Sequence, residues 1–154
     1  MSGWTSLQAN DWTVFVPGSD WHLEASTAGG ADVLSPDGQS TANLGDRESQ
    51  TPWTLGSLFQ AAMGSVTGLS VDCQSAVQRS ASMTSQATEF TGEVQGEAVH
   101  GVVVLSLLAP TTPDFYAGEV RSIYTPAAQW STSAEQTLWL IVKHAVFAPP
   151  QQQP

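Results

Sequence analysis

The chain has 154 residues, of which 41% are hydrophobic, so it is long enough to fold around a core of its own. Only four Lys and Arg residues oppose 14 Asp and Glu residues, which gives a formal net charge of −10 at pH 7. Nucleic acids and anionic membrane surfaces are bound through clustered cations, so this charge balance argues against both as partners. We predict one domain over residues 1–150, a disordered tail over residues 151–154 and a monomeric state.

Charged residues make up only 12% of the chain, and Ser, Thr, Gln and Gly supply most of its polarity, a style typical of exported proteins. Cys73 is the single cysteine, which excludes an intramolecular disulfide. The opening MSGWTSLQANDW has neither a basic nor an apolar segment, so we expect no signal peptide in it. The longest apolar run, Val102–Leu108, is too short to cross a bilayer. We predict a periplasmic or secreted protein without membrane insertion, and a cytoplasmic location stays open.

The first third of the chain favours short strands separated by Gly and Pro turns. Alternation in the second strand places Trp21, Leu23 and Ala25 on one face. Pro36-Asp37-Gly38 is typical of a tight turn, because Pro presets φ and Gly accepts a positive φ. Four strands are expected here, at residues 12–16, 21–25, 31–34 and 40–44.

The densely charged residues 45–50 are expected to form a loop before a helix over Thr51–Met63. Thr51 is the predicted N-cap, and Pro52 suits the first helical position, where no backbone N–H is needed. Residues 65–87 are ambiguous, although the alternation over residues 69–73 is compatible with a strand. Further strands are predicted at residues 88–94, 98–108 and 115–124, with a hairpin turn at Gln95–Glu97. Because Val102–Leu105 is apolar on both faces, its strand should lie at the centre of the sheet.

The last predicted element is a helix over Ser133–Phe147. Thr132 and Glu135 have the spacing of a capping box, and Pro149 should stop the helix. Its apolar stripe is Leu138, Ile141, Val142 and Ala145. The fold class that follows is α+β, an antiparallel β-sheet with helices packed on its faces.

Catalytic and metal-binding motifs are missing from the sequence, which contains no nucleophile elbow, HExxH, P-loop or EF-hand pattern. We therefore predict no cofactor and no metal. His22 and Glu24 share one strand face, which we interpret as solvated. If the chain is an enzyme, His100 with Glu97 or Glu119 is the first candidate pair. Lys143 and His144 complement the dipole of the last helix. An alternative is a Ca²⁺ site built from four acids of the loops: Asp32, Asp37, Asp46 and Glu48.

Tryptophans give the one compositional indication of a binding surface. Trp53 and Trp139 are placed to pack helices against the sheet, whereas Trp4 and Trp130 fall outside the predicted elements. We predict that Trp4 and Trp130, together with the charged segment Asp46, Arg47 and Glu48, form the binding residues.

The element order resembles the PsbP-like superfamily, which includes a photosystem II extrinsic subunit, a Ran-binding import factor and bacterial lipoproteins. The resemblance is carried by Val14-Phe15-Val16-Pro17, Trp21 and Asp32–Gly38, and by Trp130 before the last helix. Gly18-Ser19-Asp20 departs from the tighter turn of the relatives. The resemblance implies an α/β/α sandwich and a binding role for a protein or small-molecule ligand, and it transfers no catalytic residue.

Three hypotheses for function follow. The leading one is a non-enzymatic binding or assembly module. The second is a small pocket enzyme, an isomerase or hydrolase, that uses His100 and a carboxylate. The third is an engineered display scaffold, because the segments 18–20 and 46–50 differ in character from the rest of the chain.

Overall fold

A computed structural model describes residues 3–25 and 30–147, and for residues 132–134 and 147 it describes the backbone alone. The predicted tail at residues 151–154 lies outside the described residues. The helices are α1 (Leu55–Ala62), α2 (Thr132–His144) and the short 3-10 helix η1 (Ala127–Gln129). The strands are β1 (Thr5–Ala9), β2 (Trp12–Val16), β3 (His22–Ala25), β4 (Ala31–Leu34), β5 (Thr41–Ser49), β6 (Thr67–Gln74), β7 (Gln78–Arg79), β8 (Met83–Val94), β9 (Glu97–Leu108), β10 (Tyr116–Pro126) and β11 (Val146–Phe147).

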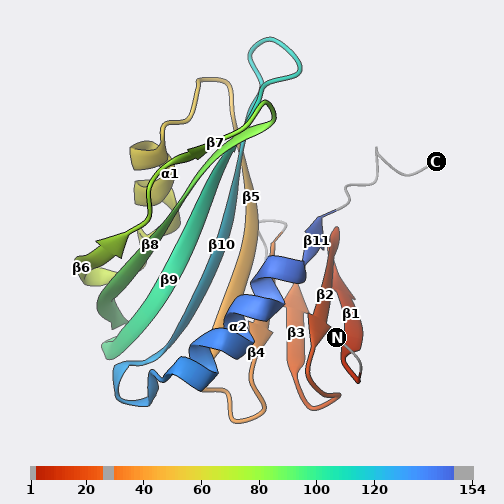
Figure 1. The fold of residues 1–154 in the computed structure, drawn as a ribbon, viewed down its shortest axis with the longest axis vertical. Coiled ribbons are helices and arrows are strands. Elements are labelled where there is room, and N and C mark those ends of the chain that lie inside the picture. Colours follow the sequence, from red (N-terminus) through yellow and green to blue (C-terminus); the bar gives the residue numbers. More distant parts are fainter. Residues whose placement is uncertain (1–2, 26–29, 148–154) are drawn as a thin grey trace.

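Two antiparallel sheets organise these strands (Figure 1). Eight strands form the large sheet, whose central order is β3-β4-β5-β10-β9-β8-β6, with β7 paired to β8. The small sheet has the order β1-β2-β11. Strand β9 lies between β8 and β10, as its apolar middle predicts. Gln95 and Gly96 both have positive φ in the turn between β8 and β9, the geometry that a two-residue hairpin turn requires.

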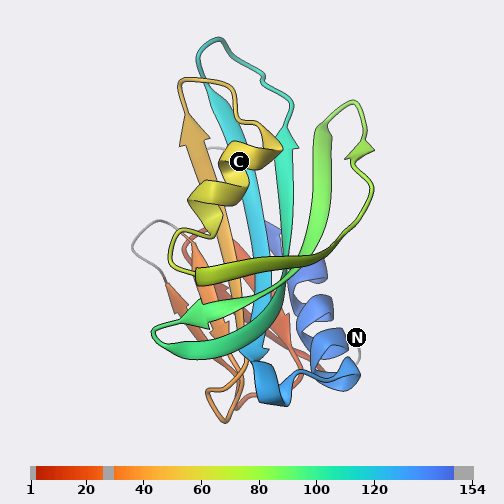
Figure 2. The same ribbon diagram turned by 90° about the vertical axis from the view of Figure 1, so that its left-hand side faces the viewer.

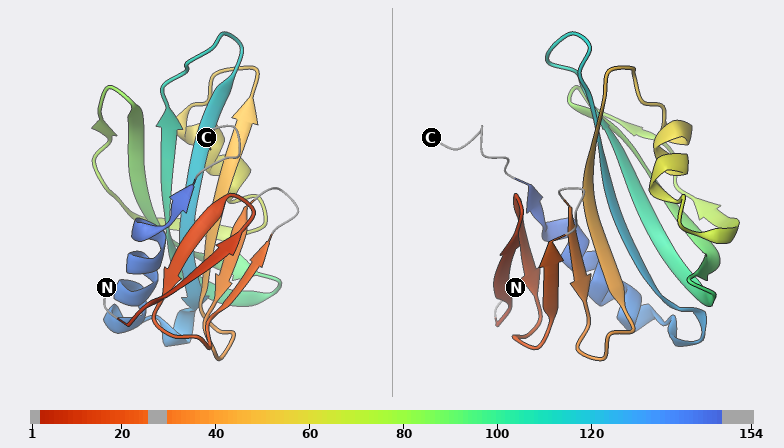
Figure 3. Two further views of the ribbon diagram at one scale, coloured as in Figure 1. Left: turned by 90° about the vertical axis from the view of Figure 1, so that its right-hand side faces the viewer. Right: turned by 180° about the vertical axis from the view of Figure 1, so that it is seen from behind.

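The two helices cover opposite faces of the large sheet, which confirms the predicted α+β class with helices on both faces. Helix α2 crosses one face together with the small sheet, and α1 lies on the other (Figure 3, right). The large sheet also curls, so that β6 runs across the others below α1 (Figure 2). Among the described residues, neither helix has the length and apolar character needed to span a membrane.

Alternating residues of the central strand β10 serve two separate cores. Ile123 belongs to the core under α2, where it meets Trp12 of β2 and Leu138 of α2. Val120 belongs to the core under α1, together with Leu58 of α1 and Phe90 of β8. The close approach of α1 depends on Gly118, because a Cβ there would lie 2.9 Å from the Leu58 side chain. One strand therefore supports both layers.

The predicted charged loop at residues 45–50 is wrong, because β5 runs without a break from Thr41 to Ser49. Its second half pairs with β10, with Asp46 opposite Glu119 and Arg47 opposite Gly118. The charged and turn-forming residues of this segment favour a loop. In the folded chain, however, its backbone pairs with strand β10, which is distant in sequence and supplies the hydrogen bonds of a β-ladder. The strand at 12–16 is confirmed, although it belongs to the small sheet rather than to a single meander.

Both helix starts differ from their predictions. Helix α1 begins after Thr54, not Thr51, because Thr54 and Ser57 form a reciprocal capping box. In α2, Glu135 N–H donates to the carbonyl of Ser131, so Thr132 is already helical. Helix α2 also ends at His144, and Val146 leaves it to pair with β2. The predicted stripe of the last helix is buried, with Leu138, Ile141 and Val142 inside α2 and Ala145 directly after its end. In α1, Leu58 is buried.

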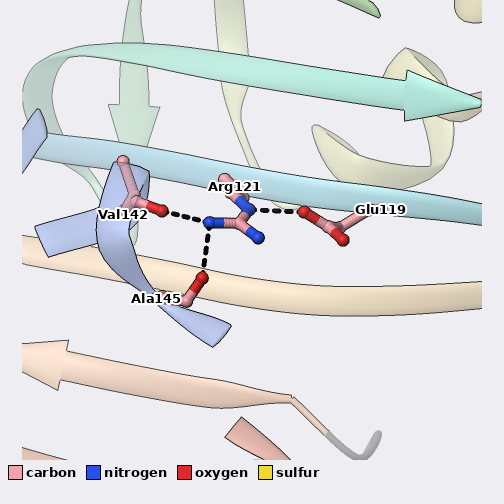
Figure 4. Close-up of polar contacts among 4 residues, drawn as sticks. All are labelled: Glu119, Arg121, Val142 and Ala145. Carbon is pink, nitrogen blue, oxygen red and sulfur yellow. Dashed lines mark hydrogen bonds and ion pairs between the residues drawn. The ribbon is translucent and has the colours of Figure 1, made fainter. Parts of the chain in front are cut away.

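A single arginine ties the end of α2 to the sheet (Figure 4). The Arg121 guanidinium donates to the carbonyl oxygens of Val142 and Ala145, the latter at 3.0 Å, and pairs with Glu119 on the same strand. It also lies 5.3 Å from the centre of the Trp12 ring. The carbonyls at a helix end have no partner within the helix, and a cation there also complements the dipole. Arg121 thus links β10, α2 and β2.

We predict that Arg121→Met destabilises the fold by about 3 kcal/mol, because it leaves buried carbonyls and the Glu119 carboxylate without their partner. Both side chains are largely buried, with 20% and 18% of their surfaces exposed. Urea unfolding followed by circular dichroism measures the free energy. Arg79→Met on exposed β7 is the matched control, expected to change stability by less than about 0.5 kcal/mol. Equal effects for the two variants would contradict the role of Arg121.

Candidate functional site

A cavity of about 280 Å³ lies between α1 and the face of the large sheet that α1 covers. Its apolar wall comes from the end of α1, the segment after it and two strands of the sheet, β8 and β10: Ala62, Met63, Val66, Phe90, Val94 and Val120. Ligand pockets in proteins are mostly apolar, with a few polar groups that orient the bound molecule. This cavity has that composition.

The polar side of the cavity is built from β4, β5 and β10. Asn43 donates a hydrogen bond to the Asp32 carboxylate at 2.6 Å, and both residues line the cavity with Ser122 and Tyr124. Burial raises the pKa of Tyr124 above its usual value, while a hydrogen bond with Thr41 opposes the rise. The phenol is therefore a neutral hydrogen-bonding group at ordinary pH. The sequence analysis named Asp32 as a loop acid but missed Asn43, Ser122 and Tyr124, because only strand pairing brings these residues together.

The three predicted binding residues of β5 do not act as one group. Asp46 and Arg47 line the cavity, whereas Glu48 does not. In the strand register, Asp46 pairs with Glu119 and Glu48 pairs with Ala117, so these three acids follow one face of the sheet. Burial, followed by repulsion from Glu48 and Glu119, raises the pKa of Asp46 to about 6. Binding by these residues stays a prediction.

Trp4 and Trp130 lie elsewhere in the molecule. Both are half-buried and pack against the core between α2 and the two sheets, rather than standing free on the surface. The Trp130 indole stacks on the His100 imidazole, with ring centroids 4.3 Å apart and planes 6° from parallel. Neither tryptophan lines the cavity under α1. Their role in binding also stays a prediction.

His100 has a different carboxylate partner from those predicted. Its Nε2 lies 3.7 Å from an oxygen of Glu89 on β8, with 22% and 35% of the two side chains exposed. Glu97 sits at the exposed start of β9, and Glu119 is paired with Arg121. The alternation of β8 carried a signal for Glu89, since it must face away from buried Phe90.

The remaining sequence candidates are structural or solvated. His22 and Glu24 lie 3.7 Å apart with 72% and 60% of their side chains exposed, as a solvated pair would. Asp37 is held within the β4–β5 turn, where hydrogen bonds from Ser35 and the Gln39 backbone lower its pKa. Among the described residues, the loop acids proposed for Ca²⁺ do not gather into one group of ligands.

The raised pKa of Asp46 predicts that the stability of the fold depends on pH. In the folded state the Asp46 carboxyl group stays protonated up to about pH 6, whereas in the unfolded chain it loses its proton near pH 3.8. The free energy of unfolding therefore falls as the pH rises from 3.8 to about 6. We expect Asp46→Asn to remove this fall and to gain about 1 kcal/mol at pH 7, after allowing for screening by water. Urea unfolding from pH 4 to 7 measures it. Asp20→Asn, at an exposed site, is the control, and a shared profile for the two variants would contradict the assignment.

Comparison with known proteins gives a structural likeness alone. No protein-family model matches the chain, and no characterised protein matches its sequence. In structure the chain is similar to LpqN, described as involved in cell envelope biogenesis of Mycobacterium tuberculosis. The TM-score is 0.51 at 10% sequence identity, over 95% of this chain and 91% of LpqN. At that identity the likeness shows the fold alone.

Proposed function

We propose that this chain is a non-enzymatic binding module of an exported protein, and that it takes a small amphipathic ligand in the cavity under α1. The observation that carries the proposal is the composition of that cavity. An apolar ligand body would lie against Phe90, Val120 and Met63, while its polar group would meet Asp32 and Tyr124.

The position of the histidines favours binding over catalysis at this cavity. His100 is on the face of β9 that points away from the cavity, because its neighbours Val99 and Gly101 face the α1 side with Phe90. Among the residues that the structure describes, the cavity lining holds no histidine, cysteine or lysine. A proton transfer there would depend on Asp32, Tyr124 or Asp46. The first two already share a hydrogen bond with a neighbour. The strand register places the Asp46 side chain on the face of Glu119, opposite to that of Val120.

Two further observations support an exported, soluble binding module. LpqN, which shares the fold, is described as involved in cell envelope biogenesis, and an exported location for this chain agrees with that. The net charge of −10 and the low share of charged residues agree with a soluble binding module that repels its own copies. Fold likeness is a weak warrant for function, so the cavity remains the main support.

The proposal is tested with N-phenyl-1-naphthylamine, a neutral dye that fluoresces in apolar surroundings. We expect saturable fluorescence with the unmodified chain, and a dissociation constant at least about ten-fold higher for Ser122→Phe. Ser122 lines the cavity from β10, so the added ring fills the space that a ligand would use.

The matched control is Gln8→Phe, which adds the same ring at an exposed position of β1. We expect it to bind the dye as the unmodified chain does. Circular dichroism and thermal unfolding show whether each variant is folded. Equal dye binding by Ser122→Phe and the unmodified chain would place the dye elsewhere and reject the cavity as the binding site.

A further inference from the structure

Three potential metal ligands meet on the sheet face opposite the cavity. One ligand atom each from Asp72, Glu89 and His100 lies within 4.8 Å of the other two. The three residues come from strands β6, β8 and β9, which are neighbours in the large sheet. Glu89 and His100 are half-buried, and Asp72 is exposed. The group therefore has two ligands on paired strands and one that solvent reaches.

The strand register explains why these residues converge. His100 pairs with Thr91, and Glu89 lies two residues before Thr91, so both side chains follow the same face. The pairing of β6 with β8 shifts between Val71 and Cys73, which makes Asp72 the extra residue of a β-bulge. A bulge redirects a side chain that regular alternation would place on the other face.

The imidazole ring of His100 is held in place by stacking, but among the described residues its Nε2 atom has no hydrogen-bond partner. Trp130 stacks flat against the ring at 4.3 Å. The Nε2 atom is shielded from solvent, and among the described residues it has no hydrogen-bond partner, since the Glu89 oxygen lies 3.7 Å away. A buried polar atom without a partner is costly. A ligand placed between Nε2 and the two carboxylates would remove that cost.

We propose that Asp72, Glu89 and His100 bind a divalent transition-metal ion, with Zn²⁺ as the reference metal. Bonds of about 2.1 Å in tetrahedral geometry require ligand atoms about 3.4 Å apart, close to the 3.7 Å between His100 and Glu89. The ion neutralises two adjacent carboxylates, and the imidazole selects transition metals over Ca²⁺ and Mg²⁺, which prefer oxygen. The fourth position is open to water.

This site is separate from the proposed ligand cavity, so each can fail alone. None of its three residues lines that cavity. A second histidine–carboxylate pair of the chain serves as a control, because His22 Nε2 and Glu24 Oε1 also lie 3.7 Å apart. That pair is mostly exposed, and within the described part of the chain it belongs to no group of three potential ligands. It should bind metal far more weakly than the three-residue site does.

The test is calorimetric titration of ZnCl₂ into the full chain without a polyhistidine tag. Co²⁺ absorption reports the number and geometry of the ligands. We expect one saturable site, and an affinity at least about ten-fold lower for Glu89→Gln. Glu24→Gln, the same change in the exposed pair, should bind as the unmodified chain does. Asp72→Asn alters an exposed residue, so it removes a ligand with little risk to folding.

Loss of binding in Glu89→Gln and Asp72→Asn, with retention in Glu24→Gln, would establish the site. The proposal is overturned if the unmodified chain takes up no single saturable equivalent of Zn²⁺. It is equally overturned if Glu24→Gln weakens binding while folded Glu89→Gln and Asp72→Asn do not.

Discussion

The contact of Arg121 with the end of α2 is the constraint from which the arrangement of layers follows. Strand β10 presents alternate residues to the two faces of the large sheet, and Arg121 stands on the face that α2 covers. Its guanidinium supplies donors to carbonyls that a helix end leaves free, and Glu119 compensates its charge. A polar anchor of fixed geometry sets where α2 ends, which burial of apolar surface alone would leave less defined.

With α2 on one face, the curled sheet and α1 enclose the opposite face, and the cavity lies there. The close approach of Leu58 to Gly118 brings α1 against β10, while Phe90 and Val120 line the cavity. His100 and its acidic neighbours lie across the sheet from this space. The two candidate sites therefore share strand β8 but no side chains.

The acidic residues of the large sheet lie in different electrostatic environments. Asp46 and Glu119 are opposite one another on paired strands, and the Arg121 charge is engaged by Glu119. Asp46 is left beside like charges in a partly buried position, which raises its pKa. Glu89 instead faces an imidazole and Asp72. The register of distant strands, rather than local composition, decides which acids meet.

Features that depend on near neighbours in the chain could be predicted from the amino-acid sequence. The buried stripe of α2 and the Gln95-Gly96 turn were predicted because helical and strand periods and turn residues act over a few positions. The charged segment of β5, the cavity and the partner of His100 were not, since each depends on pairing between residues far apart in the chain. Local preference favours a loop at Asp46, and only the ladder to β10, formed in the tertiary structure, makes it a strand.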